Sequence, residues 1–177
     1  MSKEGDVISF ETTLTKHSNE SGWHFLNIDK AIAGKLSFEG KSRRVVCTIN
    51  GAHTFQCALL PVSGGGGYCI IVNKKIRDKL GIADGYTVKV KLEKDESKYG
   101  LPMPEEFREV LNQDPEGDRL FHALTAGMQR SMLYYIGKWK DVDRRIHYGL
   151  VVVEHLKKND GKIIGKQLAE ELKRPMF

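Results

Sequence analysis

Long apolar runs are missing from this sequence. No stretch of its 177 residues approaches the roughly 20 apolar residues that a membrane-spanning helix needs, and the longest candidate covers residues 150–153. The chain starts with MSKEGD, which is polar and unlike the basic and apolar start of a signal peptide. We therefore expect a soluble chain that is neither inserted in a membrane nor exported.

Cysteine is scarce. The three cysteines, Cys47, Cys57 and Cys69, cannot form a complete set of disulfides, and their spacing matches no metal site. These features favour a reducing, cytoplasmic compartment over an oxidising one. Disorder is excluded for most of the chain, because 40% of its residues are hydrophobic and 8% are aromatic, as in an ordinary globular protein.

A strong charge of one sign is also missing. The chain has 28 basic and 23 acidic residues, a net charge of +5 that is too mild for an obligate nucleic-acid-binding protein. Residues 102–177 hold 13 of the basic and 12 of the acidic residues, which leaves 15 and 11 for the first part of the chain. From the predicted turns there we take four candidate nucleic-acid-binding residues: Lys30, Lys74, Lys75 and Arg77. The alternative is that these side chains only solvate exposed turns.

Catalytic and cofactor motifs are absent from the sequence. The glycine run at residues 64–67 lacks the Gly-Lys-Ser/Thr and the following helix of a phosphate-binding loop, and we interpret it as a flexible connection. Six histidines lack a partner at a spacing that forms a metal or acid–base site: His17, His24, His53, His122, His147 and His155. We expect no metal, no cofactor and no catalytic residue, and the sequence favours a protein without enzymatic activity.

An internal repeat is the most informative feature that is present. Residues 25–40 recur 44 residues later as residues 69–84. The copies share four identical positions: Lys30/Lys74, Ile32/Ile76, Lys35/Lys79 and Leu36/Leu80. After each copy, apolar and polar residues alternate with period two, which predicts β-strands with one buried face. Asn50-Gly51 predicts a hairpin turn between the strands at Val45 and Phe55. The repeat therefore predicts a duplicated β module with internal pseudo-two-fold symmetry.

Helical signals replace this alternation in the second part of the chain. Asp114-Pro115, Thr125 and Asp141 are each placed to start a helix, and apolar residues follow at spacings near 3.6. The β-branched run at residues 151–153 is ambiguous alone, and its position within a helical stripe predicts a helix. A further amphipathic helix is expected after Lys162. The sequence thus predicts an α+β protein with a duplicated β-barrel domain over residues 1–100 and an all-helical region over residues 101–177.

Two stretches, together covering about residues 8–158, resemble known families. The first resembles the family called domain of unknown function 1905 through these segments: Trp23 with the strand after it, residues 48–51, 55–60, 72–77 and 80–82, Gly85 and Val88. The second resembles the YdeI/OmpD-associated, or bacteriocin-protection, family through these residues: Phe121, Leu124, Ile136, Lys140, residues 144–146 and the closing helix.

These resemblances imply a fold more than a function. The first family is similar in fold to the double-split β-barrel of AbrB and MazE, which implies a double-split β-barrel here. AbrB-like barrels are built by two chains, whereas this chain supplies both halves, and we expect a monomer. The resemblances also imply a bacterial protein with a role related to stress or bacteriocin protection.

Basic and aromatic residues gather where the third predicted helix of the second part turns into the fourth. Five of them are candidate ligand-binding residues: Lys138, Trp139, Lys140, Arg144 and Arg145. Cations beside aromatic rings are used to recognise anionic ligands and single-stranded nucleic acids. The alternative is that Trp139 belongs to the core while the cations interact with Asp141 and Asp143.

Two hypotheses about function remain. The first is a non-catalytic module that binds an anionic ligand, a protein or a nucleic acid. The second is an enzyme that acts on a small molecule in a cleft between barrel and helices, with His24 or His53 as an unrecognised base. We prefer the first, because the residues that could act as acids, bases or nucleophiles have no catalytic partner at a spacing that can be recognised in the sequence.

Overall fold

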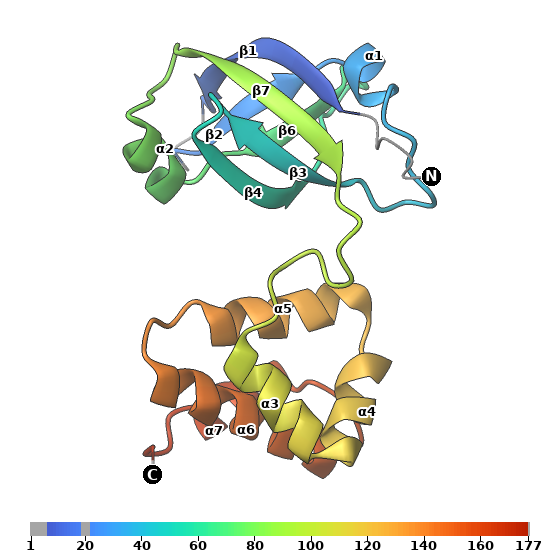
Figure 1. The fold of residues 1–177 in the computed structure, drawn as a ribbon, viewed down its shortest axis with the longest axis vertical. Helices are drawn as coiled ribbons and strands as arrows, with labels where there is room; N and C mark the ends of the chain where they lie inside the picture. The colour runs from blue at the N-terminus through green and yellow to red at the C-terminus, as the bar shows by residue number, and fades with distance from the viewer. Residues whose placement is uncertain (1–6, 19–21, 177) are drawn as a thin grey trace. The chain divides into compact units, whose positions relative to one another are not determined.

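The computed structural model describes residues 7–18 and 22–176. The chain divides into two compact units, one up to Glu96 and one from Ser97 onward. The first unit is a curled antiparallel sheet, and the second is built of helices (Figure 1). The α+β class predicted from the sequence is therefore confirmed.

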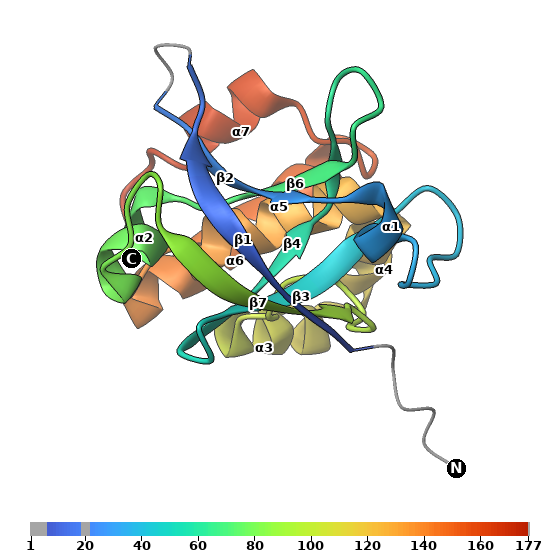
Figure 2. The same ribbon diagram turned by 90° about the horizontal axis from the view of Figure 1, so that it is seen from above.

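The N-terminal domain is a sheet with two short helices in its connections. In the described part of the chain its elements are β1 (Ile8–Lys16), β2 (His24–Ile28), α1 (Lys30–Ala33), β3 (Arg44–Ile49), β4 (His53–Ala58), β5 (Leu60–Pro61), β6 (Tyr68–Ile71), α2 (Lys74–Leu80) and β7 (Thr87–Lys94). The strand order is β4-β3-β7-β1-β2-β6-β5, and every neighbouring pair is antiparallel. Only Leu59 separates β4 from β5 along the chain, although these strands end the order on opposite sides, so the sheet curls (Figure 2).

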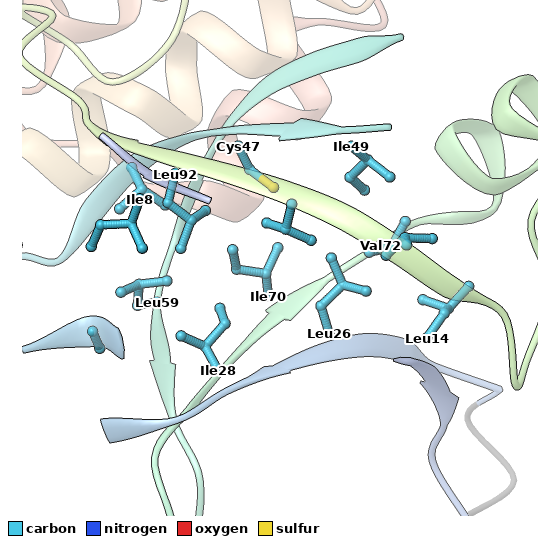
Figure 3. Close-up of a cluster of buried hydrophobic side chains, with 14 of the residues drawn as sticks. Ile8, Leu14, Leu26, Ile28, Cys47, Ile49, Leu59, Ile70, Val72 and Leu92 are labelled. Carbon is cyan, nitrogen blue, oxygen red and sulfur yellow. The ribbon is translucent and has the colours of Figure 1, made fainter. Parts of the chain in front are cut away.

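Side chains on the inner face of this curl form the core of the domain (Figure 3). The predicted alternation in β3 is confirmed, because Val45, Cys47 and Ile49 are fully buried while the residues between them are half-exposed. Leu26 of β2 and Ile70 of β6 are also fully buried. Removal of these apolar surfaces from water stabilises the sheet, at about 25 cal/mol per Å².

The predicted hairpin at Asn50-Gly51 is confirmed, with both residues at positive φ. Asn50 also extends the ladder between β3 and β7. Its backbone N–H donates to the Lys89 carbonyl at 2.8 Å, and its side-chain oxygen accepts from the Lys89 N–H at 2.9 Å. The turn therefore joins β7 through hydrogen bonds as well as through side-chain packing.

The second unit contains five helices in its described part: α3 (Glu105–Gln113), α4 (Pro115–Ala123), α5 (Ala126–Gly137), α6 (Val142–Lys158) and α7 (Gly165–Glu171). Three predicted helix starts are confirmed by capping hydrogen bonds. The side chains of Asp114, Thr125 and Asp141 each accept a hydrogen bond from a backbone N–H three residues later.

Helix α6 contacts each of the other helices of this unit and contributes more buried apolar side chains to its core than any other helix in the described residues. Its β-branched run, which is ambiguous on its own, is helical and fully buried as predicted: Val151, Val152 and Val153. Phe107 of α3 and Phe121 of α4 meet edge to face, with ring centroids 5.1 Å apart. Gly117 lets α4 approach α6, because a Cβ atom there would lie 2.5 Å from Val153 Cγ1.

Gly117→Ala is expected to destabilise the helical domain. The added methyl group would collide with Val153, and overpacking of a filled core costs about 1–3 kcal/mol. Urea unfolding followed by circular dichroism measures the change in the free energy of unfolding.

Gly127→Ala is the matched control, since a Cβ atom at this position in the first turn of α5 would have no atom within 4 Å. Alanine is the better helix former by up to about 1 kcal/mol, so this variant should be as stable as the parent or more stable. Equal destabilisation by both substitutions would refute the close packing of α4 on α6.

Candidate functional site

The candidate ligand-binding residues of the helical unit lie together at the turn between α5 and α6. We call this surface the α5–α6 corner and define it by these residues: Tyr134, Tyr135, Lys138, Trp139, Lys140, Arg144 and Arg145. Helix α5 ends at Gly137, and the side chain of Asp141 accepts from the Arg144 N–H at 2.9 Å to begin α6. The short turn between these ends brings the cations of both helices to one place.

Arg145 is the fixed member of the corner. Its guanidinium donates to the Glu106 carboxylate of α3 at 2.6 Å, and to the carbonyl oxygens of Trp139 and Lys140 at 2.9 and 3.2 Å. The hydrogen bond between the two side chains lowers the pKa of Glu106 and raises the pKa of Arg145. Arg145 therefore holds the turn against α3.

Lys138 and Arg144 lie on the Trp139 ring. The Lys138 ammonium is 5.0 Å from the ring centroid, and the Arg144 guanidinium carbon is 4.6 Å from it. In the described part of the chain no ion pair joins these cations to Asp141 or Asp143. The alternative that the sequence left open is thus not formed as ion pairs by Lys138 or Arg144, whereas the charge of Asp141 helps to raise the pKa of Arg145.

Trp139 also has a packing role. Its ring is half-buried and meets Tyr148 of α6 edge to face at 5.5 Å. The ring thus belongs partly to the core, as the alternative interpretation held, while it supports the two exposed cations. Lys140 is exposed, and its backbone carbonyl accepts from Arg145.

A cavity of about 500 Å³ adjoins the corner. Its apolar walls include Pro102 and Pro104, which precede α3, and Leu133 of α5. Tyr134 and Lys138 also line it, together with the Glu106–Arg145 pair. The sequence did not single out the prolines or Glu106 as site residues, because they precede Tyr134, the first residue of the corner, by 28 to 32 positions and no spacing pattern connects them.

The four candidate residues of the N-terminal domain have different surroundings. Lys74 pairs with Asp78 at 2.8 Å on the exposed face of α2, and Arg77 donates to the Val72 carbonyl at 2.8 Å. Lys30 and Lys75 are exposed and form no ion pair within the described residues. Two of the four cations are thus already engaged within the domain.

The two histidines considered as bases each have a contact within the N-terminal domain. His24 donates through Nδ1 to the Gly22 carbonyl at 2.8 Å. His53 stacks on Phe55 with ring centroids 5.8 Å apart, and burial together with the charges of Lys79 and Lys75 lowers its pKa. Within residues 7–18 and 22–176, no cluster of histidine, cysteine and carboxylate side chains could hold a metal ion.

The cysteines are free thiols and lie in the N-terminal sheet. A hydrogen bond with Cys57 and burial raise the pKa of Cys47, and burial raises the pKa of Cys69. Both thiols stay protonated at neutral pH, whereas a thiolate is the reactive form. Cys47 is fully buried and Cys57 packs against the same core, which agrees with the interpretation of these two cysteines as small hydrophobic residues.

A buried histidine–carboxylate pair was not predicted from the sequence. His155 of α6 is fully buried, and its Nε2 accepts from the Ile164 N–H at 3.0 Å. Its Nδ1 therefore carries the proton and donates to Glu171 of α7 at 2.6 Å. Gln167 and Lys158 also donate to Glu171, and the pair ties α7 to α6.

A second unpredicted set joins the segment before α3 to α4. The His122 Nδ1 donates to the Asp118 carbonyl at 2.9 Å and lies 3.1 Å from its carboxylate, while the Tyr99 hydroxyl meets Nε2 at 2.7 Å. In each set one contact joins two segments: His155 of α6 reaches Glu171 of α7, and His122 of α4 reaches Tyr99 before α3. Sequence separations of 16 and 23 residues gave no signal that could have found them.

The fold and the corner define a two-domain protein, with a curled antiparallel β-domain followed by a helical domain that carries a cationic and aromatic corner. Residues 10–92 match the family model described as Domain of unknown function (DUF1905), and residues 101–159 match the one described as Bacteriocin-protection, YdeI or OmpD-Associated. Both family resemblances drawn from the sequence are confirmed. A comparison with curated proteins finds no match to the chain. None of the helices in the described ranges is long and apolar enough to cross a membrane.

The substitution Glu171→Gln is expected to make the free energy of unfolding depend less on pH in the acidic range. Hydrogen bonds from Gln167, His155 and Lys158 lower the pKa of Glu171 from 4.5 to about 2. A lowered carboxyl pKa contributes stability above the unfolded value, and this contribution is lost as pH falls from about 4.5 to about 2. The variant should lose about 1–3 kcal/mol at pH 7 and little near pH 2. Urea unfolding at several pH values measures this difference.

The neighbouring Glu170→Gln is the control, because Glu170 pairs with Lys173 on the solvent-exposed side, where ion pairs contribute about 0–1 kcal/mol. Its pH profile should follow that of the parent. A Glu171→Gln profile parallel to the parent at all pH values would contradict a stabilising role for the ionised carboxylate.

Proposed function

We propose that this protein is a non-catalytic module that binds an anionic ligand at the α5–α6 corner. The observation that carries this proposal is the position of Lys138 and Arg144, which lie on the Trp139 ring and pair with no carboxylate among the described residues. A ring face attracts a cation without using its N–H donors as a carboxylate would. These donors therefore stay available to a phosphate or carboxylate group.

The cavity beside the corner supports the same proposal. Its volume of about 500 Å³ is within the usual range of small-ligand pockets, about 300–1,000 Å³. Apolar walls with a few polar groups are also typical of such pockets. Lys138 belongs to the lining of the cavity and to the cationic set on Trp139, so one ligand can use both.

We also propose that the N-terminal domain is an AbrB-like double-split β-barrel made of two copies of one module. The first copy is β1–β2–α1–β3 and the second is β4–β5–β6–α2–β7, where β4 and β5 together correspond to β1, β6 to β2 and β7 to β3. When the two copies are exchanged, the pairing β1·β2 becomes β5·β6 and the pairing β1·β7 becomes β4·β3. The pairings β2·β6 and β3·β7 stay the same. Leu26 lies opposite Ile70, its counterpart 44 residues later. A local two-fold axis would produce this pattern.

The remaining proposals concern the setting of the protein. We propose a monomeric protein of the bacterial cytoplasm, since one chain supplies both copies of the module and Cys47, Cys57 and Cys69 are free thiols. A role in stress or bacteriocin protection is proposed from the second family description. Lys30 and Lys75 are proposed as secondary contacts to nucleic acid, with Lys74 and Arg77 contributing charge.

The enzyme hypothesis is the weaker proposal. His24 donates to a backbone carbonyl, and His53 stacks on Phe55, so neither base candidate faces an acid in the described part of the chain. An orienting acid beside the base is a regular part of acid–base and nucleophilic sites.

The combined substitution Lys138→Ala and Arg144→Ala is expected to weaken polyanion binding at least about tenfold at low salt, because each cation contributes a charge-assisted contact. Fluorescence anisotropy with labelled inorganic polyphosphate measures the affinity. A salt series measures the number of ionic contacts, and the slope should fall when both cations are removed.

The control removes the same charge elsewhere on the helical unit, by Arg119→Ala on α4 and Lys166→Ala on α7, both exposed. This variant should bind about as tightly as the parent. The proposal fails if polyphosphate does not bind at low salt, or if both double variants weaken binding equally.

A further inference from the structure

We infer that the anionic partner of the α5–α6 corner is single-stranded nucleic acid, with bases stacked on Tyr134 and Tyr135 and phosphates held by Lys138 and Arg144. This inference rests on the proposed function and names its ligand class. It is argued from exposed rings, the cations beside them and the neighbouring cavity.

Two consecutive tyrosines of α5 leave their rings in solvent. Tyr134 is 61% exposed and Tyr135 is 47% exposed, although Leu133 and Ile136 on either side of them are buried. The two rings meet edge to face, with centroids 6.1 Å apart and an angle of 70° between their planes. They therefore present two differently oriented faces, and each can take one base.

The cations lie directly beside these rings. The Lys138 ammonium is 4.9 Å from the Tyr135 centroid and 5.0 Å from the Trp139 centroid. The Arg144 guanidinium also lies over the Trp139 ring. In a single strand each base is joined to a phosphate, so stacking and ionic contacts alternate along the chain. An acidic peptide would use the cations and leave the tyrosine faces bare.

The cavity of about 500 Å³ adjoins the exposed rings and offers room for a further base. Tyr134 and Lys138 line it, and the Glu106 carboxylate on its wall, held in place by Arg145, offers an acceptor to the edge of that base. Tyr135, Trp139 and Arg144 are not part of this lining. A mononucleotide in the cavity would leave them uncovered, whereas a strand of several nucleotides reaches the cavity and the rings together.

The test compares four labelled probes by fluorescence anisotropy. Three are single chains of similar charge: an oligothymidylate of about twelve nucleotides, an abasic strand of equal length and polyglutamate. The fourth is the duplex of the oligothymidylate with oligoadenylate, which carries about twice that charge. The parent protein should bind the oligothymidylate about tenfold or more tighter than the other three, since each stacked base adds affinity and pairing hides the bases. Tyr134→Ala with Tyr135→Ala should lower oligothymidylate affinity to the level of the abasic strand.

Two controls accompany this variant. Phenylalanine at both positions keeps the rings and should retain binding, and Tyr86→Ala removes a tyrosine that is 52% exposed in the other domain and should change nothing. Circular dichroism of each variant checks that it is folded. Tyr86, Tyr134 and Tyr135 are all exposed, so these substitutions are expected to leave the fold intact.

Equal affinity for oligothymidylate and the abasic strand would overturn the stacking inference, as would unchanged binding after removal of both rings. Tighter binding of polyglutamate would point to an acidic protein and would also overturn it. In each case the proposed function stands if polyphosphate binding still depends on Lys138 and Arg144, and it falls separately if that dependence is missing.

Discussion

The contact between Arg145 and Glu106 is the constraint on which the α5–α6 corner depends. One guanidinium holds a carboxylate of α3 and two backbone carbonyls of the turn, so it joins three segments with a single side chain. Charge-assisted hydrogen bonds of this kind are shorter and stronger than hydrogen bonds between neutral groups. Arg145 binds the Glu106 carboxylate, whereas the exposed cations Lys138 and Arg144 lie over the Trp139 ring and pair with no carboxylate among the described residues.

The N-terminal domain depends on a different constraint, which is the continuity of the sheet around one apolar core. A strand with alternating burial can keep one face dry only if the sheet bends around that face. The strands at both ends of the order, β4 and β5, are adjacent along the chain, and the buried Leu59 lies between them. The basic side chains of this domain are therefore left outside, where some, such as Lys74, are neutralised by neighbours.

Long-range polar contacts complete the helical domain. His155 and His122 each use both ring nitrogens, one on α6 toward α7 and the other on α4 toward the segment before α3. A buried polar group must find partners, because leaving it without them costs about 1–3 kcal/mol. The ring nitrogens of His155 thus join α6 to α7, and those of His122 join α4 to the segment before α3, so both rings make structural hydrogen bonds.

The sequence by itself determined the elements of this protein and their buried faces. Period-two alternation identified β3 and β7, capping residues such as Asp114 and Asp141 identified helix starts, and the Asn50-Gly51 turn identified a hairpin, because these signals are local and act over a few residues. Only the tertiary structure decided which cations remain available. Arg145 is held by Glu106, 39 residues away, while Lys138 rests on an aromatic ring, and no local pattern encodes a contact between side chains brought together by folding.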